Sequence, residues 1–133
     1  MEPSTLKTVA QLTIPADPQN LAVCRLALAA MAGALPLSEQ AVEDLKLVTS
    51  EMCSNAIAHG YDGAEGEIEL EFRVSERELE MVVIDHGHGF AGPADRLKPG
   101  VGLTLLTKLC SRHLITSEVE RGTRVVFAYP LAT

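Results

Sequence analysis

Three side chains that could do chemistry stand in a row in the stretch "TSEMCSNAIAHGYDG", residues 49–63. Glu51, Asn55 and His59 follow one another at four-residue steps, so a helix would place them along one side. A positioned carboxylate can take a proton from a hydroxyl group, and a carboxamide oxygen is a hard ligand that suits Mg²⁺. By itself the Glu–Asn pair is more typical of the solvated flank of an amphipathic helix, so a function for it depends on other parts of the chain.

A second candidate group follows an apolar run, at "DHGHGF", residues 85–90. Asp85 ends the run, and Gly87 and Gly89 allow either positive φ or the close approach of a ligand to the backbone. A carboxylate at such a position can accept a hydrogen bond from an amino group. Alone, the pattern also fits a plain turn. A metal site at His86 and His88 is not expected, because it would occupy Asp85 and offers no fourth ligand at a recognisable spacing.

A third group, "KPGVGLTLL" at residues 98–106, places Gly100 and Gly102 directly before a helical pattern. Free N–H groups at a helix start attract anions, and Lys98 could add a positive charge for a phosphate. Further along, Gly122 and Thr123 precede the last strand and place a small hydroxyl near the sheet.

Hydrophobic periodicity and turn signals predict the elements that position these groups. The expected strands cover residues 6–15, 67–75 and 78–86, with a last hairpin over 114–130 that turns at Arg121–Gly122. The expected helices cover residues 19–35, 39–59 and 102–114. This order favours a mainly antiparallel sheet with helices on one face, an α+β two-layer sandwich, in a single domain over residues 1–133.

Composition excludes several classes of protein. The chain has 133 residues, 47% of them hydrophobic, and a formal net charge of −7 with 11 Lys and Arg. Direct binding to nucleic acid or to an anionic membrane is not expected, because cationic residues supply most of that affinity. The apolar run at 26–37 is too short to span a bilayer. Three widely spaced cysteines fit a reduced, cytoplasmic protein better than a disulfide framework.

Taken in order, the four motifs resemble those of a known superfamily. "EMCSN", "DHGHG", "GVGL" and "RGTRVVF" are similar to the N-box and glycine boxes of the GHKL ATP-binding proteins, and the chain looks most like the anti-sigma-factor serine kinases among them. The resemblance covers about residues 10 to 129 and implies the Bergerat fold. It implies ATP and Mg²⁺ as cofactors.

The resemblance also implies roles for the residues of the predicted second helix. Asn55 matches the asparagine whose oxygen binds Mg²⁺, and Glu51, one turn earlier, matches the general base that activates a hydroxyl group of a protein substrate. His59 matches a frequent N-box histidine, for which a structural role at the helix end is favoured.

In the same resemblance, the base-binding group is Asp85, which would accept a hydrogen bond from the adenine amino group. Gly87 and Gly89 would let the base approach, and Thr123 would help to hold Asp85 and a water molecule.

The phosphate-binding group would consist of the backbone N–H groups of Gly100, Val101 and Gly102, with Lys98 closing over the γ-phosphate. The lid, residues 90–99, is short, and lysine replaces the arginine that related kinases often carry, so a looser grip on phosphate is expected.

The resemblance therefore predicts an ATP-dependent anti-sigma factor that phosphorylates a STAS-type antagonist on serine or threonine, sequesters a sigma factor and forms a homodimer. The short lid leaves open a nucleotide-binding switch without kinase activity. An ATPase or histidine-kinase fragment is disfavoured, because no helix with a phosphoacceptor histidine is expected ahead of the fold.

Overall fold

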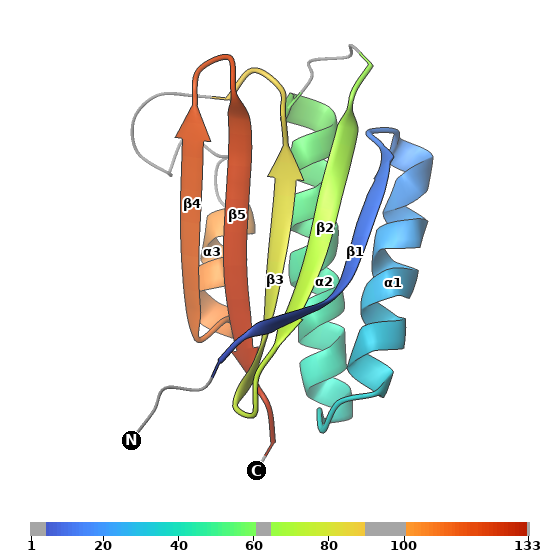
Figure 1. The fold of residues 1–133 in the computed structure, drawn as a ribbon, viewed down its shortest axis with the longest axis vertical. Coiled ribbons are helices and arrows are strands. Elements are labelled where there is room, and N and C mark those ends of the chain that lie inside the picture. The colour runs from blue at the N-terminus through green and yellow to red at the C-terminus, as the bar shows by residue number, and fades with distance from the viewer. Residues whose placement is uncertain (1–4, 61–64, 90–100, 133) are drawn as a thin grey trace.

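The computed structural model describes residues 5–60, 65–89 and 101–132. Its elements are β1 (Lys7–Pro15), the 3₁₀ turn η1 (Pro18–Asn20), α1 (Leu21–Gly33), α2 (Glu39–Asn55), the π-helical turn η2 (Ala56–Gly60), β2 (Glu67–Val74), β3 (Glu78–Asp85), α3 (Val101–Leu109), β4 (Arg112–Glu118) and β5 (Gly122–Pro130). The five strands form one antiparallel sheet in the order β1-β2-β3-β5-β4, and the helices cover one of its faces (Figure 1). The predicted α+β two-layer architecture is confirmed.

Local capping explains where the first helices begin. The Asp17 carboxylate accepts a hydrogen bond from the Gln19 N–H at 3.1 Å and opens η1, which leads directly into α1. The Ser38 hydroxyl accepts a hydrogen bond from the Ala41 N–H at 3.1 Å and opens α2 at the predicted residue. The predicted α-helix to residue 59 is wrong at its end: α2 stops at Asn55, and the chain continues as a π-helical turn.

Alternation along the strands separates the two faces of the sheet. In β2, Ile68, Leu70 and Phe72 are buried against the helices, and the glutamates between them point to the open face. The core lies between sheet and helices, and Cys24 and Cys53 are among its fully buried members. Among the described residues, no helix is long and apolar enough to cross a membrane.

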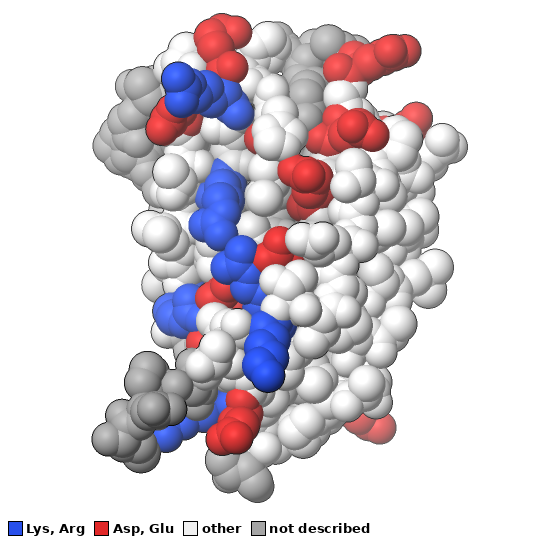
Figure 2. Space-filling model, in the orientation of Figure 1, with Lys and Arg blue, Asp and Glu red and all other residues white. Residues whose placement is uncertain are grey.

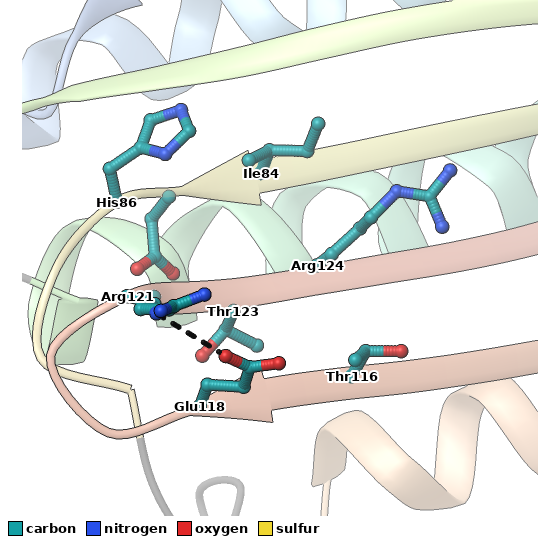
Figure 3. A pocket seen from close by; sticks show the side chains of 9 residues that line it. Ile84, His86, Thr116, Glu118, Arg121, Thr123 and Arg124 are labelled. Atoms are coloured by element: carbon teal, nitrogen blue, oxygen red, sulfur yellow. Dashed lines mark ion pairs between the residues drawn. The ribbon is translucent and has the colours of Figure 1, made fainter.

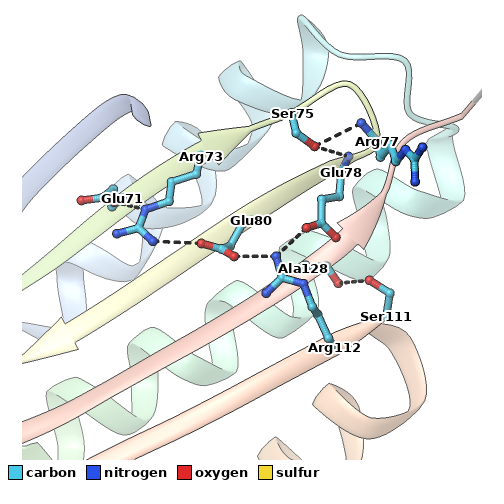
Figure 4. A network of polar contacts seen from close by, with 9 residues as sticks. All are labelled: Glu71, Arg73, Ser75, Arg77, Glu78, Glu80, Ser111, Arg112 and Ala128. Carbon is cyan, nitrogen blue, oxygen red and sulfur yellow. Dashed lines mark hydrogen bonds and ion pairs between the residues drawn. The ribbon is translucent and has the colours of Figure 1, made fainter. Parts of the chain in front are cut away.

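A charged network fixes the open face of the sheet (Figure 4). Glu80, only 4% exposed, binds the guanidinium of Arg73 at 3.1 Å and that of Arg112 at 2.5 Å. Arg112 of β4 reaches β3 across β5 because small Ala128 is its register partner and also that of Glu80. Arg73 also pairs with Glu71. The arginine side chains thus bury a carboxylate on a face that no helix covers.

The third helix is shorter than predicted. The sequence pattern favours a helix to residue 114, whereas α3 ends at Leu109 and β4 starts at Arg112. The Ser111 N–H and hydroxyl both donate to the Ala128 carbonyl, at 2.9 and 3.1 Å, which turns the chain into the sheet. Ile115 then packs against the core, so pairing with β5 outweighs the helical pattern of the sequence.

Candidate functional site

Asp85 stands at the end of β3 as a buried carboxylate, 5% exposed. Its Oδ1 accepts a hydrogen bond from the Gly87 N–H at 3.0 Å. Burial raises the pKa of Asp85, while hydrogen bonding from the Gly87 and Thr123 backbones and the nearby His86 lower it. Among the described residues no cation lies within salt-bridge distance of it, so a hydrogen-bond donor from a ligand would stabilise its charged form.

Gly89 and Gly122 tie the end of β3 to the β4–β5 turn. Gly89 has φ +62°, and a Cβ there would lie 2.0 Å from the Glu118 carbonyl oxygen. Gly122 has φ +103°, and a Cβ there would lie 2.0 Å from the Asp85 carbonyl oxygen. The Glu120 N–H donates to the His88 carbonyl at 2.6 Å. Both glycines are therefore required by backbone packing, and the approach of a base to Gly87 and Gly89 stays a prediction.

Thr123 lies beside Asp85, because the two residues are register partners across β5 and β3. Its hydroxyl lies 2.8 Å from that of Ser117 on β4, and the Ser117 hydroxyl also contacts the Gly122 carbonyl oxygen at 3.2 Å. The sequence reasoning missed Ser117. The signal was available in "LITSE", where alternation places Ile115 and Ser117 on the same face of the strand.

The α2 helix brings the second half of the site to this end of the sheet. Its last turn and η2 lie at the same end of the molecule as the end of β3 (Figure 1), and η2 packs against β3 and β5. Thr49, fully buried, donates to the Met81 sulfur at 3.3 Å and ties α2 to β3. Thr49 also went unnoticed in the sequence, where it reads as an ordinary helix residue.

Asn55 is the last residue of α2 and is 7% exposed. Within the described residues its Nδ2 is the buried side-chain atom without a hydrogen-bond partner. Glu51, one turn earlier and half-buried, makes no hydrogen bond or ion pair with a described residue. A buried, unpaired amide costs free energy unless a ligand completes it, so this helix end is suited to binding. A π-helical turn directly after it is a feature that recurs at functional sites.

The phosphate-binding group is described only in part. Val101 and Gly102 form the first turn of α3, so this helix starts one residue before the predicted start at residue 102. Lys98, Gly100 and the predicted lid at 90–99 lie outside the described residues. The side chain of His59 likewise lies outside the description, although its backbone belongs to η2.

A depression of about 170 Å³ opens at the same strand ends (Figure 3). Asp85 and Thr123 line it together with residues of the open face, including Arg124, and with the ion pair of Arg121 and Glu118 at 3.6 Å. The ring of His86 contacts Glu69 at 2.7 Å. Among the described residues, no cluster of three or more His, Cys, Asp or Glu side chains could hold a metal ion.

Known proteins resemble this chain in sequence and in fold. The chain is 39% identical over 83 residues to the serine-protein kinase RsbW of Bacillus pumilus, a match covering 60% of this chain and 51% of that protein. It is 33% identical over 114 residues to RsbW of Bacillus thuringiensis, covering 74% and 71%. It thus spans about half the length of the first of these relatives. A histidine kinase domain from Erythrobacter litoralis EL346 shares the fold, with a TM-score of 0.63 and 23% identity over 89% of this chain and 62% of that one.

The sequence model of the histidine kinase-like ATPase domain matches residues 14–129, which include all four motifs. The resemblance noted from the motifs is thereby confirmed. The chain belongs to the histidine kinase-like ATPase family and, within it, is related to the RsbW serine-protein kinases.

Proposed function

We propose that the chain is an ATP- and Mg²⁺-dependent serine/threonine-protein kinase that acts as an anti-sigma factor. The observation that carries this proposal is the end of α2, where Asn55 follows Glu51 by one turn and its buried Nδ2 has no hydrogen-bond partner among the described residues. Related proteins named serine-protein kinase RsbW support the class of reaction.

The donor set at α2 fits Mg²⁺ bound to nucleotide. Mg²⁺ keeps several waters and takes few protein ligands alongside substrate phosphates, so the single Asn55 oxygen is a sufficient contribution. The Asn55 Nδ2, which has no partner among the described residues, could donate a hydrogen bond to a phosphate oxygen of the nucleotide. When bound, Mg²⁺-ATP supplies the phosphoryl group to be transferred.

Asp85 suits the recognition of an adenine amino group. It is buried and accepts a hydrogen bond from the Gly87 N–H, while the paired hydroxyls of Thr123 and Ser117 lie on the adjacent strand β5 and on β4 beyond it. Backbone N–H groups of Gly100, Val101 and Gly102, with Lys98, are proposed to hold the phosphates.

Glu51 is proposed as the general base. Half-buried and without a partner among the described residues, it is free to accept the proton of a serine or threonine hydroxyl presented by the substrate. It lies one turn before Asn55, so a base and a metal ligand would stand on one side of the same helix.

The proposed substrate is a STAS-type anti-sigma-factor antagonist, and the proposed second partner is a sigma factor, with a homodimer in the cytoplasm as the working form. The net charge of −7 supports a basic protein partner and opposes direct contact with nucleic acid or an anionic membrane.

Glu51→Gln tests the kinase reaction. The substitution keeps size and helix propensity, so nucleotide affinity and partner binding should be unchanged while phosphorylation of the antagonist falls by roughly 10²–10⁴-fold. Phosphopeptide mapping and calorimetry measure the two effects. Glu43→Gln, on the same helix with its carboxylate 3.4 Å from Lys46, is the matched control and should keep full activity.

If the wild-type protein binds ATP and its partner but yields no phosphopeptide, the kinase proposal is refuted and a nucleotide-binding switch is favoured. Phosphorylation that survives Glu51→Gln would refute the role of Glu51 as base.

A further inference from the structure

The open face of the sheet carries a basic strip in a chain that is acidic as a whole. Figure 2 shows Lys and Arg side chains following one another down this face, although the formal net charge is −7. Arg73 of β2, Arg112 of β4 and Arg124 of β5 belong to it. Arg73 and Arg112 share the Glu80 carboxylate, so their charges are compensated within the sheet. Arg124 makes no ion pair or hydrogen bond with a described residue through its side chain.

Arg124 lies between two uncharged neighbours. Its register partners are Ile84 on β3 and Thr116 on β4, so the three side chains share the open face. They line the depression of about 170 Å³ at this end of the sheet. Figure 3 shows the Arg124 side chain extending along β5, away from the β4–β5 turn. The depression thus offers a half-buried guanidinium with an apolar side chain on one side and a hydroxyl on the other.

Two carboxylates close to the depression already have partners. Glu118 pairs with Arg121 at 3.6 Å, and Glu69 contacts the His86 ring at 2.7 Å. Figure 3 shows the Arg124 guanidinium apart from the Arg121–Glu118 pair. A guanidinium binds a carboxylate especially well, because two parallel hydrogen bonds can join them. A carboxylate from another molecule would therefore complete Arg124.

An exposed apolar side chain lies next to the depression. Leu114, 61% exposed, comes two residues before Thr116 on β4 and points to the same face. Two residues of a strand span about 7 Å. An extended segment with an acidic and an apolar residue two positions apart therefore matches the spacing of Thr116 and Leu114. A helical segment does not, because residues two positions apart on a helix face different directions.

We propose that this part of the open face binds an extended acidic segment of a partner protein. An aspartate or glutamate of the segment would bind the Arg124 guanidinium and accept a hydrogen bond from the Thr116 hydroxyl, and an apolar residue two positions away would pack on Leu114. Asp85 is the register partner of the core residue Ile68, so its side chain is on the helix side of the sheet. The binding therefore needs no nucleotide and goes beyond the proposed kinase reaction.

Charge complementarity favours such a segment over nucleic acid or a second copy of this chain. Arg73 and Arg112 are paired with Glu71, Glu78 and Glu80, so little of the charge of the strip is available to a phosphate backbone. A two-fold dimer through this face would bring two basic strips together.

The probe is a blocked peptide of sequence threonine–glutamate–threonine–leucine–threonine, compared with the same peptide that has glutamine in place of glutamate. Titration into the ¹⁵N-labelled full chain should shift the backbone signals around Leu114, Thr116 and Arg124 and the Arg124 Nε–H signal. The glutamate peptide should bind about tenfold more tightly. Equal binding of the two peptides, or shifts centred elsewhere, would overturn the proposal. Equally strong shifts from inorganic phosphate or from a single-stranded oligonucleotide would also overturn it, because either would show a general anion site.

Variants localise the contact. Arg124→Gln should abolish the preference for the glutamate peptide, and Arg124→Glu should reverse it in favour of a peptide with lysine at that position. Leu114→Ser should weaken both peptides about fivefold, because it removes the apolar contact that they share. Arg77→Gln is the matched control and should bind like wild type, because it removes an exposed arginine from the β2–β3 turn at the other end of the sheet.

The result for Arg124→Gln also separates this surface from the nucleotide site. Its ATP affinity in calorimetry should equal that of wild type, and a joint loss of ATP and peptide binding would overturn the proposal. A preference for glutamate that survives Arg124→Gln would refute the role of Arg124, and wild-type affinity in Leu114→Ser would refute the apolar contact. Light scattering that shows a dimer which Arg124→Glu dissociates would assign the face to a second copy instead.

Discussion

Replacement of Asp85 by asparagine should separate nucleotide recognition from stability. The carboxylate is 5% exposed and already accepts one hydrogen bond, from Gly87 at 3.0 Å, which an asparagine oxygen could keep. A hydrogen bond from an adenine amino group to a charged acceptor contributes roughly 2–3 kcal/mol, so ATP affinity should fall by about 30- to 150-fold. The amide can also present a donor where the base offers one, which adds to the loss.

The same substitution should not lower the free energy of unfolding and should raise it at neutral pH. Burial raises the pKa of Asp85, so the folded chain binds this proton more tightly than the unfolded chain does. Ionisation therefore opposes folding: the penalty grows as the pH rises from the ordinary aspartate range, about 3.9, to the raised folded value, and stays constant above it. Asp85→Asn removes the penalty and should be at least as stable as wild type at neutral pH.

Calorimetry with ATP and Mg²⁺ and urea unfolding at several pH values measure both effects. Asp44→Asn is the control, because Asp44 also accepts hydrogen bonds, from Tyr129 at 3.3 Å and Gln40 at 2.9 Å, but Tyr129 is the register partner of Leu79, near the opposite end of β3 from Asp85. Unchanged ATP affinity in a folded Asp85→Asn protein would refute the assignment of Asp85 to the base. A stability difference that does not vary with pH would refute the electrostatic reasoning.

Three further substitutions test the end of α2, the β4–β5 turn and the charged network on the open face of the sheet. Asn55→Ala should abolish the Mg²⁺ dependence of nucleotide binding in calorimetry and leave the fold intact, whereas loss of folding would make Asn55 a structural cap. Gly122→Ala should lower the free energy of unfolding by roughly 1–3 kcal/mol in urea, because its Cβ meets the carbonyl oxygen of the facing strand and φ is positive; a wild-type midpoint would contradict this. Glu80→Gln should cost roughly 1.5–3 kcal/mol in thermal unfolding by leaving Arg73 and Arg112 without their shared carboxylate, and an unchanged transition would show that solvent replaces it.

Local signals in the sequence were sufficient for most of the fold. Ser38 and the glutamates after it predicted the start of α2, and the alternation of "EIELEFRV" predicted both β2 and the face it buries. Non-local pairing decided the rest. The segment "CSRHL" continues the helical pattern of α3, and only the bonds from Ser111 to Ala128, residues 17 apart in the chain, turn it into the sheet. A pattern confined to the residues near Ser111 cannot reveal that Ala128 is its partner.

The candidate site likewise has residues that the sequence identified and features that depend on non-local structure. Glu51, Asn55 and Asp85 were visible because each is a polar residue in an apolar context. The π-helical turn after Asn55 was not, since its residues, Ala56 to Gly60, have no local feature that distinguishes a π-helical turn from an α-helical one. The pairing of Ser117 with Thr123 required knowledge of the β4–β5 register.

The glycines near Asp85 have a role that was only partly visible in the sequence. In the sequence Gly87 and Gly89 suggested either positive φ or room for a ligand, and in the structure Gly89 and Gly122 let the β4–β5 turn pack directly on the end of β3. The Asp85 backbone is thus in contact with Gly122, and the exit of the strand is bonded to Glu120. Because this turn fixes the position of the buried carboxylate, changes in the turn should alter nucleotide affinity through the backbone of Asp85, without any contact between the turn and the nucleotide.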